Sequence, residues 1–463
     1  MTAHMPIASS PPARRRGAPA RPIPASDVST SVGLVGLATL LAWIAFCRAW
    51  PQIAPVFGAD PASGVLSGPL AALAAMALTG LAMGIWSVVV DKVHLRPSTG
   101  IDWSNPRPID QAMETASTKI AALWVTYGVL AGLFCLGRWY WDGQYLFSMQ
   151  VLGWAAIPLF VLCVPYVIWL DRYMIRPRDH AWHFGAMLLR REAWDPHEVK
   201  KHWRAWIIKG FFSAFMISIL PFGFRAVVEA DFGAVLGNPV MLGVLLFELL
   251  FVIDVQIGTV GYLLTLRPLD AHIRSGNPFL AGWVAALLCY PPFVFAFMGN
   301  GGVIQYENNT AGWGHWFAGN EPLLWAWAAI LVALTAIYAW ATVAFGIRFS
   351  NLTYRGVLTH GPYRFTRHPA YLSKNLFWWL SVMPFITVSG STVDVIRNTI
   401  FLGVVSGIYY WRAKTEEAHL LGEDEKYRDY FEWMNRHGIV TAPLHRLLEK
   451  LKPKGAIAPQ PAE

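Results

Sequence analysis

Apolar segments, each long enough to cross a lipid bilayer, recur along this chain. A membrane-spanning helix needs roughly 20 predominantly apolar residues. Charged residues make up only 14% of the 463 residues, well below the roughly 25% of a soluble protein. We therefore expect an all-α polytopic membrane protein with about ten transmembrane helices, over residues 32–50, 69–90, 120–139, 151–170, 207–228, 240–264, 279–298, 323–346, 372–388 and 396–411.

The basic residues between these segments follow a sided pattern. Cytoplasmic loops of membrane proteins carry an excess of Lys and Arg. With the N-terminus in the cytoplasm, only four of the 37 Lys and Arg fall on the outer side, each near a span end: Arg48, Arg138, Arg225 and Arg397. The pattern predicts that both termini are cytoplasmic. It also accounts for the net charge of +8 without a nucleic-acid partner.

Composition divides the chain further. Residues 1–31 are rich in Pro, Ala and Ser, which predicts a disordered cytoplasmic tail. Residues 32–300 hold about seven spans of unknown role, residues 320–445 form a second membrane domain, and residues 446–463 are a flexible C-terminal tail. In the loop 171–204, the order Asp195-Pro196-His197-Glu198 predicts a helix start with Asp195 as N-cap. A tight turn at residues 390–392 predicts that the last two spans form an antiparallel hairpin.

Two acidic residues, Glu248 and Asp254, lie inside the span 240–264. Acids within a membrane are costly and point to function by default, so one interpretation is a proton or cation site of a transporter. The other is a structural hydrogen bond to Gln256 or to a neighbouring helix. Transporters often show repeated halves, and we find no convincing internal repeat. We favour the structural interpretation.

The densest polar cluster is the segment 355–371, RGVLTHGPYRFTRHPAY. A basic cytoplasmic loop explains its arginines but not the interleaved Gly, Pro, His and Tyr, some of which fix local turns. A second cluster follows the last span, where Arg412 and Glu416 are four residues apart and share one helical face. The intervening hairpin brings both clusters together. We expect an interfacial pocket where a charged, water-soluble cofactor meets a lipid-borne substrate.

These residues carry a family resemblance. The pattern G-P-Y-x-x-x-R-H-P-x-Y, then an apolar hairpin, then R-x-x-x-E-E and Y-x-x-Y (Tyr427, Tyr430), resembles the isoprenylcysteine carboxyl methyltransferase family and its phospholipid methyltransferase relatives. The resemblance covers residues 325–445, about a quarter of the chain. It implies methyl transfer from S-adenosyl-L-methionine to a lipophilic, membrane-embedded acceptor. The acceptor group would be an isoprenylcysteine-type carboxylate or a lipid-like analogue, and no metal is implied.

The resemblance also assigns roles by position. Arg412 would orient the acceptor carboxylate. Apart from the resemblance, an amine or thiol acceptor would chemically require a base such as His368 or Glu417. Many relatives have Gly where Ser373 stands, and Lys374 adds a charge; these departures leave the acceptor open. The cofactor-binding residues would be Arg355, Gly356, Val357, Leu358, Tyr363, His368, Pro369, Tyr371, Glu416 and Glu417.

Two other functions compete. A membrane sterol or enone reductase would use NADPH in a similar basic hairpin pocket, but the Glu416-Glu417 pair would repel an anionic dinucleotide. A non-catalytic transporter or scaffold is motivated by Asp254 and Glu248. We expect a multi-pass integral protein of a bacterial inner membrane, with its active site facing the cytoplasm. Its expected partners are the lipid bilayer and a lipophilic methyl acceptor, with the oligomeric state open.

Overall fold

The computed structural model describes residues 22–190, 192–299 and 301–451. Within these residues the regular structure is almost entirely helical. The named strands are two residues long each, β1 (Ser275–Gly276) and β2 (Thr353–Tyr354), and they pair antiparallel with Ser275 opposite Tyr354. The prediction of an all-α fold is confirmed.

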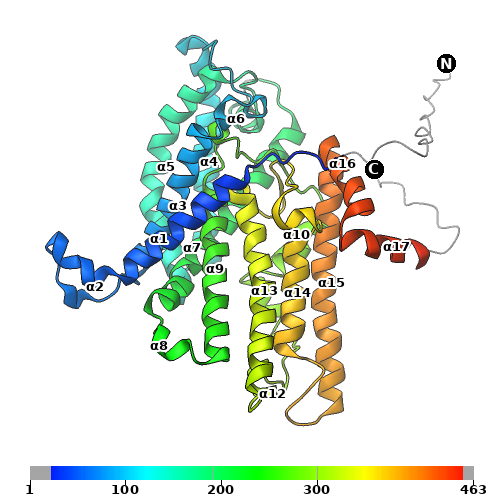
Figure 1. Ribbon diagram of the computed structural model, residues 1–463. Coiled ribbons are helices and arrows are strands. Elements are labelled where there is room, and N and C mark those ends of the chain that lie inside the picture. The colour runs from blue at the N-terminus through cyan, green and yellow to red at the C-terminus, as the bar shows by residue number, and fades with distance from the viewer. Residues whose placement is uncertain (1–21, 191, 300, 452–463) are drawn as a thin grey trace, which may run out of the picture.

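Seven helices of the described chain are long and apolar enough to cross a membrane, so the protein is a multi-pass integral membrane protein. They match seven of the expected spans, and Figure 1 shows α9 and α13 upright beside each other. The helix α7 starts as predicted, since Asp195 accepts a hydrogen bond of 2.8 Å from the backbone N–H of His197. The seven are α1 (Thr30–Arg48), α3 (Pro69–Val89), α4 (Ile109–Gly137), α5 (Leu146–Tyr173), α7 (Pro196–Glu229), α9 (Pro239–Leu263) and α13 (Glu321–Phe345).

The other three expected spans differ from simple crossings. The stretch 279–298 is broken into α10 (Leu280–Leu287) and α11 (Phe293–Phe297), because the intervening prolines cannot continue a helix. The span expected at 372–388 is α14 (Pro369–Val382), which ends before Pro384. The last span lies within α15 (Thr392–Glu423), which continues well past residue 411.

The helices α14 and α15 form the expected hairpin with unequal arms (Figure 1). The Trp379 indole N–H donates to the Ser406 hydroxyl at 3.0 Å and joins the two arms. Their connection runs from residue 383 to 391 and is therefore longer than the tight turn predicted at 390–392. The hairpin packs beside α13, which in turn packs against α9.

The main apolar core lies among α1, α3, α7, α9 and α13, with Leu40, Phe224 and Ile257 fully buried in it. The segment that follows α13 is seated against α9 at Gly261, where a Cβ would lie only 2.3 Å from the carbonyl oxygen of Phe349. Glycine at this position therefore allows the backbone around residue 349 to approach the helix closely.

Residues 22–29 form an extended segment, here called the strap, which precedes α1. In Figure 1 it crosses the end of the bundle toward α16 (Glu425–His437). The Asp27 N–H donates to the Val357 carbonyl at 2.9 Å, and the Val357 N–H donates to the Asp27 carboxylate at 2.7 Å. Lys426 on α16 forms an ion pair with Asp27 at 2.6 Å. The strap thus departs from the disorder predicted for residues 1–31, while residues 1–21 lie outside the described chain.

The C-terminal part contains one more helix after α16, namely α17 (Thr441–Leu451). The prediction of a flexible tail over 446–463 is wrong for residues 446–451, which are helical. The remaining residues of that predicted tail, 452–463, lie outside the described chain.

Candidate functional site

A cavity lies among α13, α14, α15, α16 and the segment from residue 346 to residue 363. The space between its walls amounts to about 1320 Å³, open mouth included. Val28 of the strap and Tyr290 join the wall from earlier in the chain.

One wall of the cavity joins an aromatic stack to a carboxylate. Tyr371 lies on the first turn of α14, and its hydroxyl donates a hydrogen bond of 2.5 Å to the Glu416 carboxylate on α15. The Tyr371 ring stacks on the His368 imidazole, with centroids 5.7 Å apart and planes 11° apart. Tyr409 meets the other side of Tyr371 edge-on at 5.8 Å. Glu416 is the one carboxylate that the described wall contains.

Arg412 is held on the same wall from several directions, and it is only 2% exposed. Its Nη2 donates to the Asn351 side-chain oxygen at 2.5 Å. Its Nε lies 3.5 Å from the nearer oxygen of Glu416, an ion pair without hydrogen-bond geometry. The guanidinium carbon lies 5.0 Å from the Tyr371 ring centre and 5.5 Å from that of Tyr290. The cation is therefore oriented, and its charge is only partly matched.

Glu417 lies behind this wall, buried at 4% exposure. It forms ion pairs with Arg367 Nε and Lys414 Nζ, each at 2.7 Å, and a hydrogen bond of 3.0 Å with His368 Nε2. Successive residues of an α-helix point about 100° apart, so Glu416 and Glu417 do not face the same way. Glu417 does not line the cavity, which disagrees with the prediction that it binds the cofactor.

Arg355 is also engaged inside the protein, at 4% exposure. Its guanidinium donates to the carbonyl oxygens of Gly261 at 2.8 Å, Phe349 at 2.9 Å and Ile347 at 3.0 Å, and to that of Ala271. These bonds fix the course of the segment 346–358. The backbone from residue 356 to 358 then forms part of the cavity wall.

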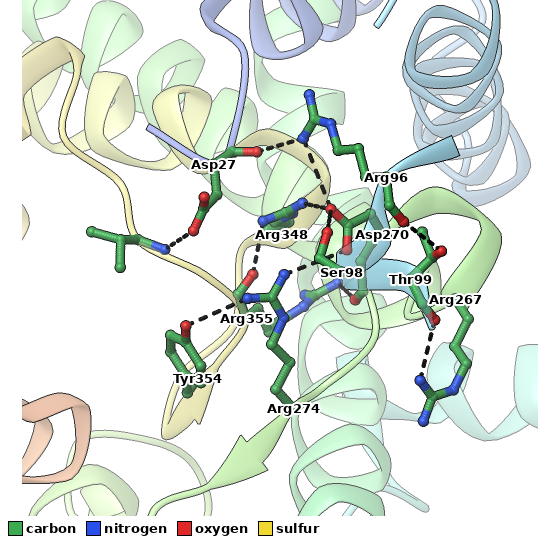
Figure 2. A network of polar contacts seen from close by, with 12 residues as sticks. Asp27, Arg96, Ser98, Thr99, Arg267, Asp270, Arg274, Arg348, Tyr354 and Arg355 are labelled. Atoms are coloured by element: carbon green, nitrogen blue, oxygen red, sulfur yellow. Dashed lines mark hydrogen bonds and ion pairs between the residues drawn. The ribbon is translucent and has the colours of Figure 1, made fainter. Parts of the chain in front are cut away.

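A second polar network anchors the same segment from behind (Figure 2). Asp270 is 2% exposed and accepts hydrogen bonds from Ser98 at 2.7 Å, from Arg274 at 3.4 Å and from Arg348. Arg348 in turn donates to the Arg355 carbonyl at 3.0 Å. The network links the loops that follow α3 and α9 to the cavity wall.

The structure brings most of the residues predicted for the site onto one cavity. Two of them, Pro369 and Glu417, do not line it. Pro369 instead occupies the first position of α14, where its missing N–H costs no hydrogen bond. The predicted residues on the wall are Arg355, Gly356, Val357, Leu358, Tyr363, His368, Tyr371, Arg412 and Glu416.

Sequence reasoning missed several wall residues. Tyr290, Tyr338 and Tyr409 lie within or beside apolar runs, where an aromatic residue is equally typical of a buried core. Asn351 was missed as well, although it is held by the hydroxyls of Tyr262 and Tyr290 and meets Arg412. In the sequence, the one indication that Asn351 belongs to the site is its position shortly before the segment 355–371.

Asp254 on α9 has partners on a neighbouring helix, as the structural interpretation predicted. Its carboxylate accepts hydrogen bonds from the Tyr338 hydroxyl at 3.0 Å and from the Thr342 hydroxyl, both on α13. Gln256 instead donates to the Ala72 carbonyl of α3 at 3.4 Å. Tyr338 and Thr342 also line the cavity, so Asp254 supports its inner wall from behind.

Neither a curated protein nor a solved structure matches the chain. A protein-family model does match part of it, and that part contains the hairpin and most of the cavity wall. The matched residues are 316–434, and the family is described as a protein of unknown function (DUF1295).

Proposed function

We propose that the cavity catalyses methyl transfer from S-adenosyl-L-methionine to a lipophilic acceptor embedded in the membrane. The favoured acceptor group is a carboxylate of the isoprenylcysteine type or of a lipid-like analogue. The observation that carries this proposal is the placement of Glu416. It is the one carboxylate on the described wall, it is held by Tyr371, and it lies beside the partly matched cation Arg412.

The wall has groups suited to each part of this cofactor. When bound, S-adenosyl-L-methionine supplies a methyl group on a positively charged sulfur. The Glu416 carboxylate would hold its amino group or ribose hydroxyls through charge-assisted hydrogen bonds. The ring faces of Tyr371 and Tyr409 favour a cation. The backbone of residues 356–358 would hold the base.

The chain's own residues account for orientation and for the exclusion of water. Arg412 offers a planar fork that suits a carboxylate, and its partial pairing with Glu416 keeps it from overbinding the nucleophile. For an amine or thiol acceptor, His368 would take the proton, and the contact of its Nε2 with Glu417 at 3.0 Å would orient the ring. The hairpin α14–α15 gives an apolar acceptor a surface to enter along, and it shields the site from water.

The arrangement of the ends supports a cytoplasmic site. The strap runs to α16 at one end of the bundle (Figure 1), and Asp27 of the strap forms an ion pair with Lys426 of α16. Both contribute to the cavity wall, through Val28 and Tyr427, as expected if the active site and the two ends of the described chain share one side of a bacterial inner membrane. The sided distribution of Lys and Arg favours the cytoplasm for that side.

A second candidate is a sterol- or enone-type reductase that uses NADPH. The observation that favours it is the charge of the wall. Because Glu417 does not line the cavity, the described wall has one acidic side chain, Glu416, and five basic ones. This excess of positive charge suits the phosphates of a dinucleotide. Three of the five have acidic partners, namely Arg348 with Asp270, Arg367 with Glu417 and Arg412 with Glu416; the other two are Arg355 and Lys374.

Calorimetry on the purified protein in a neutral detergent tests the proposal and separates the two candidates. S-adenosyl-L-methionine should bind, and Glu416→Gln should weaken it about tenfold or more, as expected for loss of a hydrogen bond to a charged group. Glu432→Gln is the matched control, because Glu432 is half-exposed on α16 beside Arg436. Binding of NADPH without binding of S-adenosyl-L-methionine would replace the proposal with the second candidate.

A further inference from the structure

Lys374 is a cation on the cavity wall that forms no direct ion pair within the described part of the chain; the acid that influences its charge is Asp254, behind the wall. It lies on α14 three residues beyond Tyr371, so both side chains share one helical face. It lines the cavity together with Tyr338 and Tyr409. No carboxylate of the described residues forms an ion pair with its ammonium group. The other basic wall residues are held by carboxylates or by backbone carbonyls.

The direction of the Lys374 side chain is unusual for its position. It lies five residues into α14, or about 8 Å along the helix axis. A lysine so near a helix end normally extends back toward water. Its ammonium instead lies 5.2 Å from the ring centre of Trp378, one turn further along the helix, and 5.9 Å from that of Tyr409 on α15. The charge is directed inward, between the arms of the hairpin.

The surroundings stabilise the charge without using its hydrogen-bond donors. Tyr338 stands between Lys374 and Asp254, with its ring centre 5.3 Å from the ammonium and its hydroxyl 3.0 Å from the Asp254 carboxylate. The two Asp254 oxygens are already engaged by Tyr338 and Thr342. An ammonium carries three N–H donors, and the ring faces, although they attract the charge, are no substitute for an anionic hydrogen-bond acceptor. A ligand with a negative charge would supply the missing partner.

We propose that Lys374 binds the anionic group of the lipophilic acceptor, so that the acceptor is an acid with a long apolar chain. This inference deepens the proposed function. It rests on that function only in identifying the bound acid as the methyl acceptor. The anion would lie near the Tyr371–Tyr409 pair, with Lys374 on one side and Arg412 on the other. Its apolar chain would extend along the hairpin into the bilayer. Lys374 thus determines specificity for acids over neutral lipids.

Direct binding of a fatty acid tests this without any turnover. The probes are palmitate and its neutral amide, palmitamide, measured by calorimetry with the purified full chain in a neutral detergent. The wild type should bind palmitate about tenfold more tightly than palmitamide, the factor that corresponds to one charge-assisted contact. Lys374→Met should abolish this preference, Lys374→Arg should retain most of it, and the exposed-site control Lys200→Met should leave it unchanged.

The result that overturns the inference is equal binding of the two probes by the wild type, or an unchanged preference in Lys374→Met. A melting temperature and a gel-filtration profile of Lys374→Met that match the wild type show that the variant is folded. A preference for palmitate that depends on Lys374, in a protein that does not bind S-adenosyl-L-methionine, would leave the anion site standing and remove the methyltransferase proposal. The two failures are therefore distinguishable.

Discussion

The Tyr371 hydroxyl donates a hydrogen bond of 2.5 Å to the Glu416 carboxylate and so joins the two arms of the hairpin at the cavity wall. Removing this hydroxyl should release Glu416 while leaving the ring stack with His368 in place. We predict that Tyr371→Phe lowers kcat/KM for methyl transfer about tenfold, the loss expected for one hydrogen bond to a charged group. Thermal stability should change little. Tyr410→Phe is the control, since Tyr410 is 60% exposed on α15, the helix that carries Glu416. Equal activity of the two variants would contradict the assignment.

Replacement by Gln should have different effects at the neighbouring carboxylates Glu416 and Glu417. Glu417→Gln leaves Arg367 and His368 beside an uncharged partner in a buried place, and breaking a buried ion pair costs about 3 kcal/mol. We expect a clear loss of thermal stability with little change in cofactor affinity. Glu416→Gln should instead lower the cofactor affinity with little loss of thermal stability. Melting temperatures and calorimetric Kd values of both variants check this, and a large affinity loss in Glu417→Gln would return Glu417 to the cofactor site.

The buried carboxylate of Asp270 should be a main support of the segment 346–358. It accepts hydrogen bonds from Arg274 and Arg348 (Figure 2), so Asp270→Asn removes the counter-charge of the buried Arg348 and of the half-buried Arg274. We predict a loss of about 3 kcal/mol in the free energy of unfolding, measured by denaturant titration in detergent. The exposed Asp110→Asn should be neutral by comparison. A neutral Asp270→Asn would show that the network does not hold the segment.

The strap should detach in acid. Burial acts to raise the pKa of Asp27, but hydrogen bonds from Lys426 and from the Val357 N–H outweigh it and hold the pKa below its usual value. A carboxyl with a lowered pKa in the folded state contributes stability above its unfolded pKa, about 3.9. That contribution is lost as the pH falls through the folded pKa. The strap should therefore stay docked from pH 8 to about pH 5 and detach only below about pH 4.

Hydrogen exchange of peptides covering residues 22–29 measures this docking. After correction for the intrinsic pH dependence of exchange, protection should be constant down to about pH 5 and fall below about pH 4. Asp27→Asn should exchange rapidly at every pH. Protection in this variant that equals the wild type would show that the Asp27 carboxylate does not hold the strap.

Local signals were sufficient for much of this structure. Asp195 and Pro196 mark the start of α7 because capping depends only on adjacent residues. The convergence of Tyr371 with Glu416 follows from a hairpin between two clusters. Helix rotation could not be predicted without packing, so Glu416 and Glu417 were treated as a pair, although only Glu416 reaches the cavity.

Other features depend on contacts between distant parts of the chain. The composition of residues 22–29 is that of a disordered tail, but these residues are ordered by docking to the Val357 backbone and to Lys426. Tyr338 lies in an apolar run, and its role at the cavity becomes visible only through Asp254 on another helix. Tyr290 reaches the wall because prolines break the stretch 279–298.

Transfer of a labelled methyl group tests the central claim most directly. Purified protein is incubated with methyl-labelled S-adenosyl-L-methionine and a membrane lipid extract, and label is then measured in the organic phase. The account predicts a labelled, apolar product that is formed by the wild type and by Glu432→Gln and is strongly reduced in Glu416→Gln. Absence of label from every lipid fraction, in a preparation that oxidises NADPH with an enone lipid, would contradict it.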